Sequence, residues 1–277
     1  MIKSIIHIIL LLVLTVLTIS CIGYPFFLGD YDFLATSISL VVQVFSIIGL
    51  ITCIPAVLWL CKRSTDKEKK FAKMYVYTSF IAFLPVLLMT ALTMSFSFGI
   101  LIFVGLVISA RFALEKIARQ NTSFGLLLPL FLTFFPIILL AFPLVVQKPL
   151  TDWSRNKAIA NSRELIDEIE NFRKKYGKYP PTLNAVHKDY KVGIRGIEKY
   201  HYTYDNTTYN LYFEQPKLLL DLFGSREFVV YNPNEKHLMI SHASWNARWE
   251  PEQVRTTQGW YASGETGHKH WKYFLFD

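Results

Sequence analysis

Residues 74–110 read MYVYTSFIAFLPVLLMTALTMSFSFGILIFVGLVISA, and none of these 37 side chains carries a formal charge. A membrane-spanning helix needs about 20 predominantly apolar residues to cross ~30 Å of hydrocarbon. One straight helix over this stretch would be about twice as long as a bilayer is thick, so two spans are predicted. Small polar residues and a glycine in Met94-Ser-Phe-Ser-Phe-Gly99 predict the turn between them.

Outward from this stretch, the first half of the chain is a predicted all-α membrane bundle. Five transmembrane helices are expected at roughly 4–28, 34–61, 74–94, 97–114 and 124–147. The fourth apolar run stops at Arg111 and reaches full length if that side chain extends to the interface. In the fifth, Pro129, Pro136 and Pro143 recur every seven residues and predict a bent helix, with a hinge as the alternative.

The positions of Lys and Arg predict the orientation of the bundle. Segment 62–73 has six basic residues against two acidic ones, and the loop after the fourth span is also basic. The opposite loops are acidic at 29–33 and uncharged at 94–99. Lys and Arg concentrate in cytoplasmic loops, so five spans with a cytoplasmic N-terminus place both basic loops on one side. We therefore expect a multi-pass protein of a cell membrane, of the bacterial inner-membrane type, with residues 148–277 outside the cytoplasm.

The net charge of +8 does not indicate a nucleic-acid partner. Residues 1–147 hold ten of the 29 basic and five of the 21 acidic side chains, and the remaining 19 and 16 lie in the tail. The cysteines, Cys21, Cys53 and Cys61, all precede the tail, which must be held by a hydrophobic core. Thr18-Ile-Ser-Cys21 resembles a lipoprotein cleavage site, and lipidation of Cys21 is an open alternative.

The spans also bear on the function class. Transporters and proton-driven proteins usually carry ionisable groups at mid-membrane depth, and here no Asp, Glu, Lys or Arg stands in the middle of a span. The sequence contains no Gly-rich phosphate loop, Gly-x-Ser-x-Gly elbow or His-Glu-x-x-His helix. No catalytic residue and no cofactor is therefore predicted, and an enzyme is disfavoured.

The tail, 148–277, is predicted to be an α+β domain with one long helix packed on an antiparallel sheet. Apolar residues at helical spacing predict a helix from about Asp152 to Tyr176, capped by Gly177. Its apolar stripe comprises Ile159, Ile166, Ile169, Phe172 and Tyr176, with Leu165 flanking it.

Beyond the helix the pattern alternates with a period of two. It predicts a hairpin of 200–204 and 209–213 joined by 205–208, and a second hairpin of 227–231 and 236–240. A closing strand is expected at 272–276.

The apolar fifth span, the amphipathic helix, Gly177-Lys-Tyr-Pro-Pro-Thr-Leu183 and the tyrosine-rich hairpin resemble the pilin family. They resemble in particular the major pseudopilin of type II secretion, in which a Gly-x-Tyr-Pro turn ends the long helix. The resemblance covers about 125–240 and implies a pilin-like fold. The prepilin cleavage motif is not matched, because the fifth residue after Gly125 is Leu130 where prepilins have glutamate. A late calcium-binding Asp-Gly loop is not found either, so pilus assembly and calcium binding are not implied.

Two groups of side chains in the tail are candidate binding residues. Large aromatic residues gather late in the chain and are typical of binding surfaces, although a small core also uses them: they are Trp245, Trp249, Trp260, Tyr261 and Trp271. His268 and His270 would point to one face of a strand and are weak candidates for a metal site. Exposed or hydrogen-bonded histidines are the alternative.

Together these features lead to two functional hypotheses. The first is an integral membrane protein that displays a non-catalytic pilin-like domain for binding, scaffolding or sensing outside the cytoplasm. Its expected partners are the lipid bilayer and a protein bound by the tail, with no nucleic acid. The alternative is a membrane-embedded enzyme or a lipid or small-molecule transporter, in which the C-terminal domain is accessory.

Overall fold

The computed structural model describes residues 2–276 except 62–64, 94, 121–124, 187–189, 205–206, 220–225 and 238–259. The chain divides into two compact units. Unit 1 comprises Met1–Gly23 and Ser37–Val146, and unit 2 comprises Tyr24–Thr36 and Gln147–Asp277. The predicted domain boundary places the first loop in the bundle, whereas in the structure this loop belongs with the tail.

Five helices are long and apolar enough to cross a membrane among the described residues, as the sequence predicted. They are α1 (Ile2–Gly23), α2 (Leu34–Cys61), α3 (Thr65–Thr93), α4 (Phe96–Arg119) and α5 (Leu127–Asn161). Helix α1 ends before the predicted residue 28, because Tyr24–Phe26 form a 3-10 turn, η1. Helix α3 starts nine residues earlier than predicted; Asp66 and Glu68 lie in its first turn, where acidic side chains interact favourably with the helix dipole.

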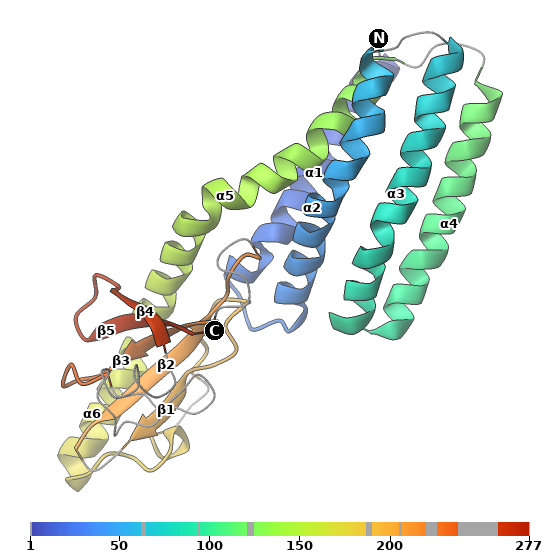
Figure 1. The fold of residues 1–277 in the computed structure, drawn as a ribbon. Helices are drawn as coiled ribbons and strands as arrows, with labels where there is room; N and C mark the ends of the chain where they lie inside the picture. Colours follow the sequence, from blue (N-terminus) through green and yellow to red (C-terminus); the bar gives the residue numbers. More distant parts are fainter. Residues whose placement is uncertain are drawn as a thin grey trace. The chain divides into compact units, whose positions relative to one another are not determined.

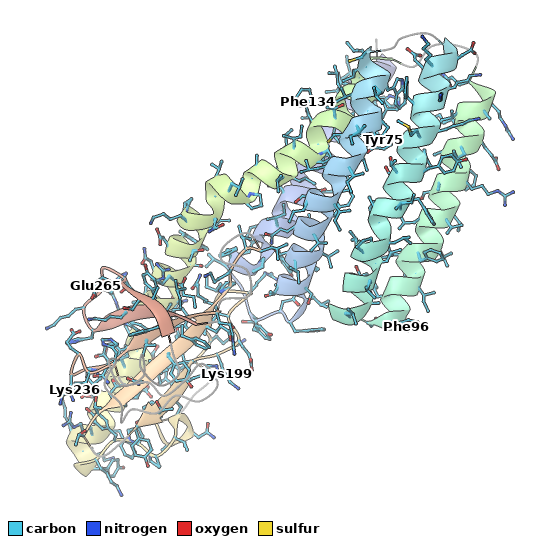
Figure 2. All side chains as sticks on the ribbon, in the orientation of Figure 1. Tyr75, Phe96, Phe134, Lys199, Lys236 and Glu265 are labelled. Carbon is cyan, nitrogen blue, oxygen red and sulfur yellow. The ribbon has the colours of Figure 1, made fainter. Side chains whose placement is uncertain are left out.

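Unit 1 consists of α1 to α4 and the first part of α5. Helices α3 and α4 form a hairpin with extensive contacts (Figure 1). Helix α2 is the most buried of the five: 33% of the residues in its most apolar segment are buried, against 6% for α1 and α4. Many large apolar side chains of unit 1 are exposed, among them Phe96 and Phe134 (Figure 2), as expected of helices that face lipid.

The buried polar side chains of α2 have partners inside unit 1. The Ser39 hydroxyl donates to the carbonyl of Ile22 at 2.6 Å, and the Gln43 amide donates to Ser39 Oγ at 2.9 Å. Ser46 and Thr52 donate to carbonyls three residues earlier in the helix. These bonds satisfy polar groups within the helices and do not by themselves indicate a transport path.

In unit 2, the predicted helix over 152–176 is divided. Helix α5 runs without interruption through the predicted domain boundary to Asn161, Ser162 forms a turn, and α6 spans Arg163–Tyr176. Leu165 and Ile169 are fully buried, whereas Tyr176 is 53% exposed. The buried stripe is therefore centred on Leu165, whereas the helical spacing of the apolar residues places Leu165 at its edge.

One five-stranded antiparallel sheet completes unit 2, in the order β1-β2-β3-β5-β4 (Figure 1). Its strands are β1 (His201–Tyr204), β2 (Tyr209–Gln215), β3 (Arg226–Tyr231), β4 (Trp260–Glu265) and β5 (Trp271–Phe276). The first predicted hairpin is confirmed, with Tyr204 opposite Tyr209. The second is wrong, because β3 pairs with β2 and β5; residues 236–237 are not strand, and 238–240 lie outside the described residues. The closing strand is confirmed as β5, and β4 was not predicted.

The core of unit 2 lies between the helices and one face of the sheet. It contains Ala158, Ile159, Leu165 and Ile169 from the helices and Leu211, Phe213, Val229 and Tyr231 from the strands. The predicted cap is present: Gly177 is left-handed, with φ of 71°, and its amide donates to the carbonyl of Arg173 at 2.8 Å. The following Tyr179 is buried against Tyr209, with ring centroids 4.9 Å apart, before the short 3-10 turn η2 (Leu183–Ala185).

Candidate functional site

The loop that joins α1 to α2 is built into unit 2 by backbone hydrogen bonds. Leu28 forms an antiparallel bridge with Ile194. The amide of Gly29 donates to the carbonyl of Gly193 at 3.1 Å, and the amide of Arg195 donates to the carbonyl of Phe27 at 3.0 Å. Leu28 and Ile194 are far apart in the sequence, so the loop is a structural part of the tail domain and not merely a connection.

Side chains reinforce this attachment around Arg195. The Tyr24 hydroxyl donates to Asp32 Oδ2 at 2.6 Å, and Arg195 Nη1 donates to the Tyr24 hydroxyl at 2.9 Å. Asp32 Oδ1 also accepts from the amide of Leu34 at 2.9 Å, so Asp32 caps the start of α2. The hydrogen bond from Tyr24, followed by that from Leu34, holds the pKa of Asp32 below its usual value.

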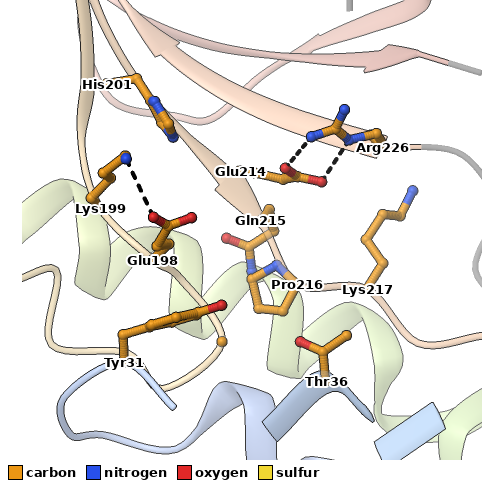
Figure 3. Close-up of a pocket in the computed structure, with 11 residues that line it drawn as sticks. Tyr31, Thr36, Glu198, Lys199, His201, Glu214, Gln215, Pro216, Lys217 and Arg226 are labelled. Carbon is orange, nitrogen blue, oxygen red and sulfur yellow. Dashed lines mark hydrogen bonds and ion pairs between the residues drawn. The ribbon is translucent and has the colours of Figure 1, made fainter. Parts of the chain in front are cut away.

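Next to this attachment is a cavity of about 340 Å³, which we call the loop–sheet pocket. The first loop, the first turn of α2, the segment before β1, and the ends of β1, β2 and β3 form its wall (Figure 3). Its lining residues are Tyr31, Thr36, Gly196, Glu198, Lys199, His201, Glu214, Gln215, Pro216, Lys217 and Arg226.

Two ion pairs stand on opposite sides of the pocket (Figure 3). On one side, Lys199 Nζ lies 3.3 Å from Glu198 Oε1. On the other, Arg226 binds both carboxylate oxygens of Glu214, at 2.8 Å through Nε and 2.5 Å through Nη2. The side chains of both pairs are 43–58% exposed, so solvent and ligands have access to their charges.

Between the pairs the wall is neutral. Burial lowers the pKa of His201, which favours the uncharged form of its ring; the ring stacks on Tyr212 with centroids 5.1 Å apart. Burial also raises the pKa of Tyr212 to about 12. Gly196 approaches the loop closely, because a Cβ there would lie 2.6 Å from the carbonyl oxygen of Pro25.

Buried polar contacts connect the sheet beside the pocket to α5. The Gln215 amide donates to Ser154 Oγ at 2.5 Å, and both side chains are almost fully buried. On β3, Glu227 Oε1 accepts from Arg155 Nη2 at 2.5 Å and from Nε at 3.1 Å. Arg155 also lies over the ring of Tyr273, 4.6 Å from its centroid. These contacts fix the ends of β2 and β3 against the helix.

Of the aromatic residues predicted as a binding surface, the structure describes the side chain of Trp271 alone. Trp271 is 4% exposed and packs in the core against Phe213 and Tyr231, which is a structural position. Trp260 and Tyr261 belong to β4, but their side chains lie outside the description, and Trp245 and Trp249 lie in the segment 238–259 that the structure leaves undescribed.

The two candidate metal-binding histidines lie in the turn before β5 and not on a strand. His268 Nε2 lies 3.0 Å from Asn156 Oδ1, whereas His270 Nδ1 lies 2.8 Å from Glu235 Oε1. The rings therefore have different partners. Within the described part of the chain, no three His, Cys, Asp or Glu side chains come together as a metal site would require.

The loop–sheet pocket could not be predicted from the sequence, because its residues come from distant segments and share no regular spacing. The only available signal was the clustering of charges at strand ends, in Glu198-Lys199 and around Glu214. No protein-family model, no curated protein and no solved structure matches the chain.

Proposed function

We propose that the protein is a multi-pass membrane protein of the bacterial inner-membrane type that displays a pilin-like domain outside the cytoplasm. The domain binds a ligand or partner and acts in recognition or sensing, without catalysis. The observation that carries this proposal is the shared unit formed by the first loop and the tail.

This shared unit restricts the topology. Residues 24–36 and 147–277 can fold together only if they are on the same side of the membrane. Five spans satisfy this condition, because four of them separate the first loop from the tail. The same arrangement leaves the basic segments around 62–73 and 111–119 on the other side, where the excess of Lys and Arg favours the cytoplasm.

The geometry of unit 2 supports the pilin-like part of the proposal. Helix α6 ends in the Gly-Lys-Tyr-Pro turn, and an antiparallel meander of β1, β2 and β3 covers the helix. Tyr202 donates to the carbonyl of Pro180 at 3.0 Å, which fastens the turn to the sheet.

The loop–sheet pocket supports a recognition role. Its exposed charges are arranged in opposed pairs, which can bind complementary groups of a ligand. The first loop leads directly into α1 and α2, and α5 continues from unit 2 into unit 1. A ligand bound in unit 2 is thereby connected through the chain to three of the membrane helices.

Cysteine labelling in intact cells tests the proposal. In a chain whose three native cysteines are replaced by serine, a membrane-impermeant thiol reagent should modify Ser263→Cys on β4. It should modify Lys67→Cys, in the first turns of α3, only after the membrane is permeabilised. Both positions are exposed in the structure. Protection of Ser263→Cys in intact cells would refute display of the domain outside the cytoplasm.

A further inference from the structure

We propose that an anionic phospholipid binds at the C-terminal end of α4, with its phosphate at Lys116 and Arg119 and its acyl chains beside Phe112. The inference rests on the membrane embedding in the proposed function. It goes beyond that function, because it assigns a lipid class to a site in unit 1.

The site occupies the side of α4 that faces away from the rest of unit 1. On the inner side, Ile117 is 7% exposed and packs with Trp59 of α2 and Ala72 of α3. At 3.6 residues per turn, the residues of the site lie on the half of the helix opposite Ile117. They are Arg111, Phe112, Glu115, Lys116 and Arg119. This side is open to lipid.

The heights of these residues along α4 match the levels of a phospholipid. Helix α4 begins at Phe96 and rises 1.5 Å per residue, so Phe112 lies about 24 Å, Lys116 about 30 Å and Arg119 about 34 Å from its start. The hydrocarbon core is ~30 Å thick. A span that begins at one edge of the core therefore carries Lys116 and Arg119 to the headgroups of the other edge. Phe112 stays at the level of the acyl chains.

The charges of the site leave an excess of cations. Glu115 Oε1 accepts from Arg111 Nε at 3.2 Å, whereas its Oε2 lies 3.8 Å from Arg119 Nη2, which is too far for a hydrogen bond. The donors of the Arg119 guanidinium therefore remain available to a phosphate. Lys116 is exposed, and no partner for its ammonium is found among the described residues. One carboxylate thus faces three cations.

The neighbouring end of α3 adds to this positive charge. The start of α3 and the end of α4 lie at the same end of their hairpin (Figure 1). The first turns of α3 carry four lysines, at positions 67, 69, 70 and 73, against Asp66 and the buried Glu68. Neither of these acidic residues is among the described residues that line the hollow beside the site. Basic pockets at this level of a membrane bind anionic lipid headgroups.

An open hollow of about 440 Å³ provides space for the headgroup. The described residues that line it are Phe112, Glu115, Lys116, Arg119 and Gln120. One water occupies ~30 Å³ of liquid, so the hollow holds roughly fifteen waters, and a phosphoglycerol headgroup of about ten non-hydrogen atoms fits. The Phe112 side chain is 68% exposed and offers an apolar surface to the acyl chains. Cations next to an apolar surface suit a lipid better than a soluble phosphate.

Native mass spectrometry of the full-length protein in a neutral detergent tests this inference. The probes are phosphatidylglycerol and phosphatidylethanolamine with the same acyl chains, which differ in net charge because the second carries an ammonium. We expect phosphatidylglycerol to bind at least about fivefold more tightly. Glycerol 3-phosphate has the phosphate without the chains, and at the same concentration it should not displace the lipid.

Variants locate the site. Lys116→Gln and Arg119→Gln should each weaken binding of phosphatidylglycerol by about fivefold or more, and should change binding of phosphatidylethanolamine little. Glu115→Gln should bind phosphatidylglycerol at least as tightly as the unchanged protein, because both arginines lose a competing carboxylate. The matched control Lys67→Gln removes a charge at the same end of the hairpin but not from the hollow, and should change the affinity by less than about twofold. Unchanged thermal unfolding verifies that each variant is folded.

Three results would overturn the inference. The first is equal binding of the two lipids. The second is displacement by glycerol 3-phosphate, which would indicate a site for a free organophosphate. The third is a loss of affinity in Lys67→Gln as large as in Lys116→Gln, which would indicate diffuse attraction without a defined site. Each of them leaves the proposed function intact if Ser263→Cys is labelled from outside, whereas a failed labelling experiment would remove the proposed function itself.

Discussion

Replacing Arg155 by methionine should destabilise unit 2 strongly, because the change removes the positively charged partner of the buried Glu227 carboxylate. Glu227 is 5% exposed and Arg155 is 9% exposed, and their closest contact is 2.5 Å. Removing one partner of a buried ion pair typically costs ~3–5 kcal/mol, since the remaining charge loses both water and its counter-ion. Loss of the contact between Arg155 and the Tyr273 ring adds to this cost.

The reverse change should be milder. In Glu227→Gln the amide oxygen still accepts from Arg155, and Arg155 Nη1 keeps its bond to Asp152 Oδ1 at 2.9 Å. We expect ~1–3 kcal/mol for this variant. The double variant Arg155→Met/Glu227→Leu removes both charges and should be less destabilised than Arg155→Met alone.

Hydrogen–deuterium exchange of the full chain in nanodiscs measures the effect on β3, whose amides are bonded to β2 and β5. A loss of 3–5 kcal/mol should accelerate exchange through unfolding by roughly 100- to 4,000-fold. The matched control is Glu214→Gln, which breaks the half-exposed pair with Arg226 and should cost only ~0–1 kcal/mol. The prediction is refuted if Arg155→Met costs no more than this control, or if the double variant Arg155→Met/Glu227→Leu is destabilised as much as Arg155→Met alone.

Three further changes have definite expected outcomes. Gly177→Ala should cost ~1–2 kcal/mol in thermal unfolding of unit 2, because φ is 71° there and a Cβ meets open space, so backbone strain is the only penalty; an unchanged melting temperature would contradict the left-handed cap. Asp32 has a folded-state pKa below the usual value of 3.8 for an aspartate, so its contribution to stability is present above that pH and is lost as the pH falls through the lower folded pKa. Amide exchange of residues 27–35, corrected for intrinsic rates, should therefore accelerate below about pH 4 in the unchanged protein and show less pH dependence in Asp32→Asn. Equal pH dependence in both proteins would exclude Asp32 as the group whose protonation releases the loop. Trp271→Ala should lower the free energy of unfolding of unit 2 by ~3–5 kcal/mol, because the indole is in the core. An unchanged melting temperature would instead indicate that Trp271 is not a core residue and remains a candidate binding residue.

The apolar helices could be predicted from the sequence because uncharged runs leave little choice of structure. The buried face of α5 continues into unit 2, and this continuation was harder to recognise from the sequence. Thr151, Ser154 and Arg155 occupy buried positions of α5, but their side chains are polar and look like surface residues. Their partners Gln215 and Glu227 lie more than 60 residues away, and no local spacing indicates them.

The failed hairpin has a comparable cause. Asn232-Pro-Asn-Glu235 has the composition of a hairpin turn, but Asn232 is fully buried. Its amide donates to the carbonyl of Tyr209 at 3.1 Å and to Asn210 Oδ1 at 2.9 Å, which ties the end of β3 to the start of β2. The other edge of β3 pairs with β5, which is distant in the sequence. Alternation of apolar and polar residues predicts strands but does not indicate which strands pair. The loop–sheet pocket likewise depends on the docking of the first loop.

That docking imposes an order on biosynthesis. Leu28 and Arg195, which form one of its contacts, are 167 residues apart. At ~5–20 residues per second, a ribosome reaches Arg195 roughly 8–33 s after it has passed Leu28. During this interval the loop between α1 and α2 lacks the segment to which it docks. Assembly of the domain is thus among the last steps, and only a nascent chain that has been extended well past its final helix can complete it.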